Sequence, residues 1–171
     1  MTDPANQQRR IGKFMVGGMW LLLLGLLTLF FSDFLEQEHN PNQQIATMQR
    51  GGQQQIMLQR NKYGHYVASG MINQQPVVFM LDTGATDISI PEKVAQRLGL
   101  QRGRAVTYQT ANGPAINYAT KLDSVSLGPI TLYNLPASIN PNVNHDDILL
   151  GMSFLKHLEF SQKGDTLTLT Q

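Results

Sequence analysis

Hydrophobic and polar residues divide the chain into three stretches with different patterns. Residues 14–31 contain no charged side chain, residues 36–59 are dominated by Gln and Asn, and residues 60–171 alternate short apolar runs with Gly, Pro and Asn. Apolar runs of about four to eight residues that end at such turn residues are typical of β-strands. The pattern therefore predicts an apolar helix, a polar linker and a mostly β domain.

The apolar stretch predicts a transmembrane anchor over residues 14–35. At about 1.5 Å per residue, a helix of this length spans the roughly 30 Å of bilayer hydrocarbon. The alternatives are a core helix, which should show a polar face, and a signal peptide, which should have a shorter apolar region before a small-residue cleavage site. Because the stretch has neither feature, we expect a retained anchor in contact with membrane lipid.

The flanking charges predict the orientation of this anchor. Arg9, Arg10 and Lys13 precede the uncharged residues 14–31, whereas Asp33, Glu36 and Glu38 follow them. Excess Lys and Arg remain on the cytoplasmic side of a membrane. We therefore expect residues 1–13 in the cytoplasm and, for a bacterial protein, a single pass through the inner membrane with the C-terminal domain in the periplasm.

Composition limits the other function classes. The chain has no Cys and a formal net charge of +1, so it has neither a disulfide framework nor a Cys-built metal site. Because no basic stripe stands out, nucleic acid is not an expected partner. The polar run at residues 144–147 consists of adjacent loop residues without defined ligand geometry, so we expect no metal site and no cofactor.

Residues 36–59 are predicted to form a flexible linker. They combine many Gln and Asn residues with Pro41 and with the glycine pair at residues 51–52, a composition that is typical of tethers. The apolar patch at residues 56–58 leaves two alternatives open. It is either the first edge strand of the following domain or a strand that the chain supplies to a partner subunit.

The remaining residues, 60–171, are predicted to form one mostly β domain with two short helices. A hairpin signal is strongest at Asn112-Gly113, a dipeptide that favours tight turns. The expected strands lie at residues 65–72, 76–81, 88–90, 122–127, 130–132, 136–139, 158–160 and 166–170, with a hairpin over residues 105–119 around Asn112-Gly113. The expected helices lie at residues 91–98 and 152–158.

Candidate chemistry is concentrated at Asp82-Thr83-Gly84, directly after the apolar run at residues 77–81. A carboxylate at the mouth of a buried strand is costly unless it is hydrogen-bonded or used chemically. One interpretation is an ordinary strand exit in which Asp82 caps nearby amides. The other is a catalytic acid, and the residues downstream favour it.

Three segments in a fixed order carry a resemblance to a known family. They are residues 81–86 (LDTGAT), 110–113 (TANG) and 149–155 (LLGMSFL). Together they resemble the retropepsin-like aspartic proteases of clan AA, in particular the membrane-anchored ones of bacteria. The resemblance implies a single-lobe acid-protease β-barrel with short helices, and polypeptides as substrates.

The resemblance also implies roles for single residues. Asp82 would be the catalytic residue, and Thr83, Gly84 and Ala85 would support its loop. Asp87 either binds the substrate backbone or faces solvent.

Two further segments receive roles from the same resemblance. Asn112 and Gly113 would form the tip of a flap over the substrate, with Tyr108 and Tyr118 as alternative flap contacts. The segment Leu149, Leu150 and Gly151 would brace the catalytic loop from beneath.

The chemistry of such a site requires a second chain. Peptide hydrolysis by carboxylates needs two of them close enough to share a proton, and the sequence contains one Asp-Thr-Gly. We therefore expect a homodimer with Asp82 from each subunit, although Thr86 and Met152 replace an ion pair that often supports the retroviral dimer. The alternative is a non-catalytic periplasmic module that binds protein or peptide on the same fold.

Overall fold

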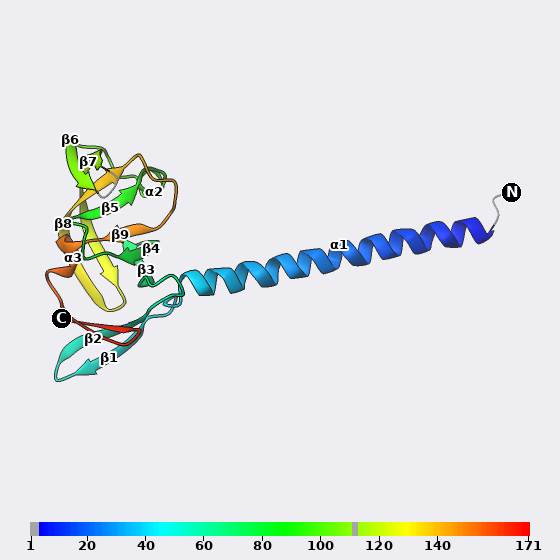
Figure 1. Ribbon diagram of the computed structural model, residues 1–171, viewed down its shortest axis with the longest axis horizontal. Coiled ribbons are helices and arrows are strands. Elements are labelled where there is room, and N and C mark those ends of the chain that lie inside the picture. The colour runs from blue at the N-terminus through cyan, green and yellow to red at the C-terminus, as the bar shows by residue number, and fades with distance from the viewer. Residues whose placement is uncertain (1–3, 111–112) are drawn as a thin grey trace. The chain divides into compact units, whose positions relative to one another are not determined.

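The computed structural model describes the backbone of residues 4–110 and 113–171, and side chains from residue 12 onward except those of residues 50 and 110. The chain divides into two compact units, one ending at Glu38 and one spanning His39–Gln171. Strands dominate the second unit (Figure 1), so the prediction of a mostly β domain after an apolar helix is confirmed.

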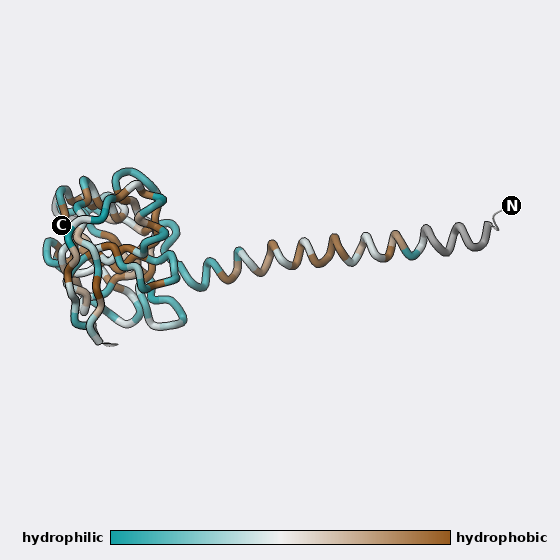
Figure 2. The backbone as a smooth tube through the Cα atoms, turned by 90° about the horizontal axis from the view of Figure 1, so that it is seen from above, coloured by the Kyte–Doolittle hydropathy of each residue, from teal (hydrophilic) through white to brown (hydrophobic). Residues whose placement is uncertain are grey.

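The first unit is essentially one helix, α1 (Pro4–His39). Within the described residues, the segment Gly12–His39 is long and apolar enough to cross a membrane, and none of its most apolar window is buried. Figure 2 shows hydrophobic positions spaced along the whole middle of this helix. These exposed apolar side chains argue against the alternative of a core helix, because a core helix buries its apolar surface.

Residues 46–59 form a hairpin, so the prediction of a flexible linker is wrong for them. Strands β1 (Ala46–Arg50) and β2 (Gln53–Gln59) pair antiparallel across Gly51 and Gly52, which have φ of 61° and 85°. Ile56 and Leu58 on β2 are fully buried in the domain core. The apolar patch is therefore a strand of its own domain.

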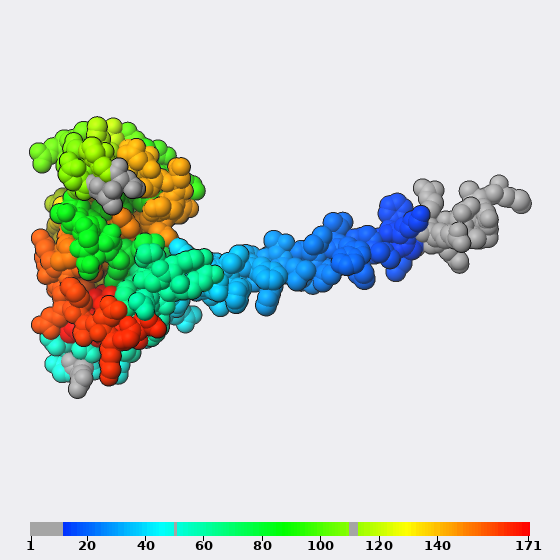
Figure 3. Space-filling model, in the orientation of Figure 1, coloured from blue at the N-terminus to red at the C-terminus, as the bar shows by residue number. Residues whose placement is uncertain are grey.

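The same hairpin belongs to a four-stranded sheet that includes the C-terminal strands. Its order is β1-β2-β11-β10, with β10 (Glu159–Lys163) and β11 (Thr166–Thr170). Since β2 lies between β1 and β11, it is an interior strand of this sheet. In Figure 3 the C-terminal strands, in orange and red, lie at the surface beside the cyan β1–β2 hairpin.

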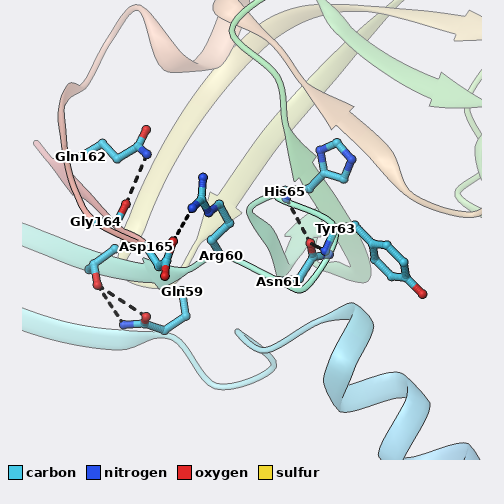
Figure 4. A network of polar contacts seen from close by, with 9 residues as sticks. Gln59, Arg60, Asn61, Tyr63, His65, Gln162, Gly164 and Asp165 are labelled. Atoms are coloured by element: carbon cyan, nitrogen blue, oxygen red, sulfur yellow. Dashed lines mark hydrogen bonds and ion pairs between the residues drawn. The ribbon is translucent and has the colours of Figure 1, made fainter.

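A polar network fixes the chain between this sheet and the rest of the domain (Figure 4). Arg60, just after β2, forms an ion pair with Asp165 in the turn between β10 and β11. Asn61 Oδ1 accepts hydrogen bonds from the backbone amides of Tyr63 and His65, at 3.0 Å each. Asn61 is 8% exposed, so its side chain replaces the backbone partners that this loop lacks.

The second sheet has seven strands in the order β3-β4-β9-β5-β8-β7-β6, and an additional pairing of β3 with β7 closes it on itself. Its strand β9 lies between β4 and β5, parallel to β4. In Figure 1 the β6–β7 hairpin and the β1–β2 hairpin lie at opposite ends of the domain. The elements are β3 (Val67–Ile72), β4 (Gln75–Leu81), β5 (Ile88–Pro91), α2 (Glu92–Arg97), β6 (Ala105–Thr110), β7 (Gly113–Leu127), β8 (Ile130–Asn140), β9 (Ile148–Leu150) and α3 (Met152–Leu155).

These elements follow the predicted ones with two main differences. The hairpin arm expected to end at residue 119 and the strand expected at residues 122–127 are one continuous strand, β7. The strands expected at residues 130–132 and 136–139 are a single strand, β8, because Asn134 adopts a left-handed conformation with φ of 57° without ending the pairing. Asn tolerates this conformation better than most residues. The barrel interior is filled by one apolar cluster that includes Phe79 and Phe154, both fully buried.

Candidate active site

The loop at residues 82–87 connects β4 to β5, and backbone contacts fix its shape. The amide of Asp82 donates to Leu150 O at 3.2 Å, and the amide of Ala85 donates to Asp82 O at 3.2 Å. The amide of Gly84 donates to Asp82 Oδ1 at 2.8 Å. This amide contact fixes one carboxylate oxygen, so the loop orients Asp82.

The structure places Leu149, Leu150 and Gly151 against this loop. Leu150 is fully buried beneath it, and a Cβ on Gly151 would overlap Asp87 O and lie 2.6 Å from Ala85 O. Only glycine permits such a close approach of two backbone segments. The segment therefore packs as the sequence predicts, through backbone contact as well as apolar packing.

Ser153 also supports the loop, although sequence reasoning did not select it. The amide of Ser153 donates to Thr86 O at 2.9 Å, and its Oγ accepts from the amide of Ile88 at 3.1 Å. The side chain is 4% exposed. A hydroxyl residue within the otherwise apolar α3 was the signal that the sequence offered.

Asp82 borders two cavities of similar size. One, of about 400 Å³, is lined mainly by apolar side chains such as Tyr66, Leu81 and Phe160 and includes Thr83. The other, of about 390 Å³, lies toward the β6–β7 hairpin and includes Gly84 and Ala85. Asp82 therefore lies between two cavities that both combine apolar and polar lining residues.

The hairpin expected to form the flap is present as β6 and β7. Gly113, with φ of 101°, pairs with Thr110 at its tip, whereas Asn112 lies outside the described residues. Tyr108 on β6 lines the second cavity and donates a hydrogen bond from its hydroxyl to Asp87 Oδ2 at 2.5 Å. Tyr118 instead stacks under the guanidinium of Arg102, at 4.4 Å, so Tyr108 is the flap tyrosine at the site.

The contact with Asp87 changes the acidity of Tyr108. Burial raises the pKa of the Tyr108 phenol above 10.0, and the hydrogen bond and negative charge of Asp87 raise this pKa further. A hydrogen bond with Ser138 acts in the opposite direction. Tyr108 therefore remains a neutral hydrogen-bond donor, and Asp87 is engaged with the flap rather than turned to solvent alone.

The polar run at residues 144–147 forms two ion pairs with distant residues. Asp146 lies 3.3 Å from Lys93, and Asp147 lies 2.8 Å from His39. Among the residues that the structure describes, no group of three or more His, Asp or Glu residues is arranged to hold a metal ion.

Comparisons with known proteins agree with this geometry. The family model described as "gag-polyprotein putative aspartyl protease" matches residues 68–157, which include the catalytic loop, the hairpin and the bracing segment. A crystal structure of a retropepsin-like aspartic protease from Rickettsia conorii is similar with a TM-score of 0.59 and 31% identity, and the match covers 74% of this chain and 95% of that chain.

Two curated relatives are known as uncharacterized proteins. One, from Sinorhizobium sp., is 36% identical over 114 residues, which are 65% of this chain and 49% of the relative. The other, from Rickettsia prowazekii (strain Madrid E), is 33% identical over 108 residues, which are 61% of this chain and 46% of the relative. The match thus spans about half the length of each relative. Because the family model covers more than half of the chain and the whole site, this protein belongs to the retropepsin-like aspartic proteases.

Proposed function

We propose that this protein is an aspartic endopeptidase that hydrolyses polypeptides between two Asp82 carboxylates, one from each subunit of a homodimer. The observation that carries the proposal is the setting of Asp82. Its carboxylate is held by the Gly84 amide at 2.8 Å and borders two cavities. A fixed acid between two substrate-sized cavities is what peptide hydrolysis without a metal requires.

The proposed chemistry uses the two carboxylates as one unit. When they share a proton, the ionised member takes a proton from a water molecule, and the protonated member donates to the carbonyl oxygen of the scissile peptide. The water oxygen attacks the carbonyl carbon and forms a tetrahedral intermediate. The protonated carboxyl then donates its proton to the departing amine while the other carboxylate takes a proton from a hydroxyl of the intermediate. The C–N bond breaks, the new carbonyl forms, and the pair again shares one proton.

The neighbouring residues support this chemistry in different ways. Thr83 is exposed at the loop, where it is available to contact the same loop of a second subunit. Gly84 and Ala85 hold the loop in shape, and the β6–β7 hairpin closes over bound substrate. Closure of such a lid excludes water from the developing charges.

The proposed location is the inner membrane, with α1 as the anchor and the domain in the periplasm. The three basic residues before the span and the acidic residues after it support this orientation. Reporter enzymes fused after Gln171 test this orientation. A reporter that works only in the periplasm should be active at this position. Activity of a cytoplasm-only reporter at that position would contradict the orientation.

The function is tested with the full-length protein in detergent and an unstructured polypeptide substrate. We expect Asp82→Asn to lower the cleavage rate about a thousandfold or more, because the dyad loses its ionisable group. The matched control is Asp123→Asn, which changes an exposed acid and should leave the rate unchanged. Equal cleavage by all three proteins would overturn the proposal. Tight peptide binding without cleavage by any of them would favour the non-catalytic binding module.

A further inference from the structure

Several polar side chains line the cavity on the hairpin side of Asp82. Asp87, Tyr108, Asn117 and Ser138 line it, and they come from the catalytic loop and from β6, β7 and β8. Asn117 is 5% exposed and Ser138 is 1% exposed. Buried polar side chains are costly unless each polar atom is paired, so the hydrogen bonds of this group define what the cavity can accept.

Hydrogen bonds connect these four side chains in a relay that ends at Asp87. The Tyr108 hydroxyl donates to Asp87 Oδ2 at 2.5 Å, because an ionised carboxylate can only accept. The Tyr108 oxygen is then free to accept from the Ser138 hydroxyl, with which it is hydrogen-bonded. Ser138 Oγ in turn accepts from Asn117 Nδ2 at 3.2 Å. Every donor in the relay is thus directed toward Asp87.

The relay leaves one acceptor without a partner. Among the residues that the structure describes, none forms a hydrogen bond with the buried Oδ1 of Asn117. A buried carbonyl oxygen without a hydrogen-bond donor destabilises the folded state. A group that enters the cavity with an N–H donor would remove this destabilisation.

The charges of the lining residues also determine which kind of donor binds best. Among the described residues that line the cavity there are two carboxylates, Asp82 and Asp87, and no Lys or Arg. A cationic donor would gain charge-assisted hydrogen bonds from this wall, whereas a neutral amide would satisfy Asn117 without the electrostatic attraction to Asp87. An apolar side chain would leave Asn117 Oδ1 unpaired.

We infer that this cavity is a specificity subsite that binds a Lys or Arg side chain of the substrate, with its N–H groups donating to Asn117 Oδ1 and facing Asp87. The inference rests on the proposed function, because it assigns a substrate class to the same site. It makes Asn117 and Asp87 the residues that determine specificity at one position near the scissile bond.

Cleavage of a peptide series by the full-length protein in detergent tests the subsite. A peptide that the protein cleaves is varied to Lys, Arg, Gln or Leu at each position flanking the scissile bond. At one position we expect kcat/KM to be about tenfold or more higher with Lys or Arg than with Leu, and intermediate with Gln. The absence of such a position in an Asp82-dependent series would overturn the inference while leaving the proposed function intact.

Variants assign the preference to the two residues. Asn117→Leu removes the free acceptor and should reduce the advantage of Lys over Leu to about twofold or less, whereas Asn117→Asp adds a charge and should increase it. Asp87→Asn keeps an acceptor for Tyr108 and should abolish the advantage of Lys over Gln. An unchanged preference in Asn117→Asp and Asp87→Asn would contradict the assignment.

A binding measurement separates this inference from the proposed chemistry. The Asp82→Asn protein is titrated with fluorescent peptides that carry either Lys or norleucine at the selected position, or at each position in turn if no cleavage is found. Tighter binding of a Lys peptide, lost in the Asp82→Asn, Asp87→Asn double variant, supports the subsite even if the wild type cleaves nothing. Equal binding of both peptides at every position would overturn it.

Discussion

Gly151 illustrates how a single residue fixes the catalytic loop. A Cβ at this position would overlap Asp87 O and lie 2.6 Å from Ala85 O, and both atoms belong to the loop backbone. We expect Gly151→Ala to lower the free energy of unfolding by about 3 kcal/mol, because backbone atoms cannot rotate away as a side chain can. Urea denaturation of the full-length chain in detergent measures this loss.

A matched control for Gly151 is Gly164, in the turn between β10 and β11. It has φ of +60°, and a Cβ there would meet nothing within 4 Å. We therefore expect Gly164→Ala to lower the free energy of unfolding by only about 1 kcal/mol, the cost of a left-handed backbone conformation for Ala. Equal destabilisation by both substitutions would show that Gly151 is not required for close approach.

Tyr108 should make stability depend on alkaline pH. Because burial and Asp87 raise the pKa of Tyr108 in the folded protein above 10.0, the folded state holds this proton at pH values where the unfolded state has released it. The contribution is complete below about pH 9 and is lost as pH rises through the folded pKa. We expect Tyr108→Phe to flatten the fall in melting temperature above about pH 10, and an unchanged slope would contradict this.

The sequence predicted those site residues whose roles are local in the chain. Asp82 and Gly84 contact each other two residues apart, so a short motif identifies both. Ser153 and Ile88 are 65 residues apart, and Asn117 and Ser138 are 21 residues apart. Their pairing depends on which strands become neighbours, and no periodicity within one segment contains that information.

At the level of elements, the β1–β2 hairpin shows the same limit. Its Gln and Asn content predicts a flexible linker, but Ile56 and Leu58 are fully buried. On its other edge from β1, β2 pairs with β11, at the other end of the domain sequence. A strand whose stability comes from so distant a partner is difficult to recognise from its own composition.

The side chain of Asn42 connects the four-stranded sheet to the barrel. We therefore expect its substitution to have a large effect on stability. Its side chain is 3% exposed, donates to Gln59 O at 2.8 Å and to Val67 O at 2.7 Å, and accepts from the amide of Gln59 at 2.7 Å. Asn42→Ala leaves three backbone groups without this partner, the buried Val67 O and the partly buried amide and carbonyl of Gln59. It should lower the free energy of unfolding by about 3 kcal/mol. Asn144→Ala, at an exposed position, is the control and should change it by less than about 0.5 kcal/mol. Thermal or urea denaturation compares the two, and similar values would contradict the role of Asn42.

At the level of the whole molecule, the proposed anchor and the proposed shared site are connected. The chain contains one Asp-Thr-Gly and one helix, within the described residues, that could hold it in a membrane. Confinement to a bilayer raises the effective concentration of chains, so a weak dimer that dissociates in dilute solution can persist there. The activity per molecule should therefore rise with the surface density of the protein.

Mixing active and inactive chains distinguishes a shared site from a complete one. Wild type and Asp82→Asn are combined in equal amounts in detergent and then reconstituted together into vesicles, so that chains pair at random. If both carboxylates are needed, activity should be about one quarter of that of the same total amount of wild type, because about one quarter of random dimers carry Asp82 on both sides. About one half would mean that each chain acts alone, and the dyad would then be wrong. An equal mixture of wild type and Asp123→Asn should retain full activity. This result would show that mixing and reconstitution do not themselves lower the activity.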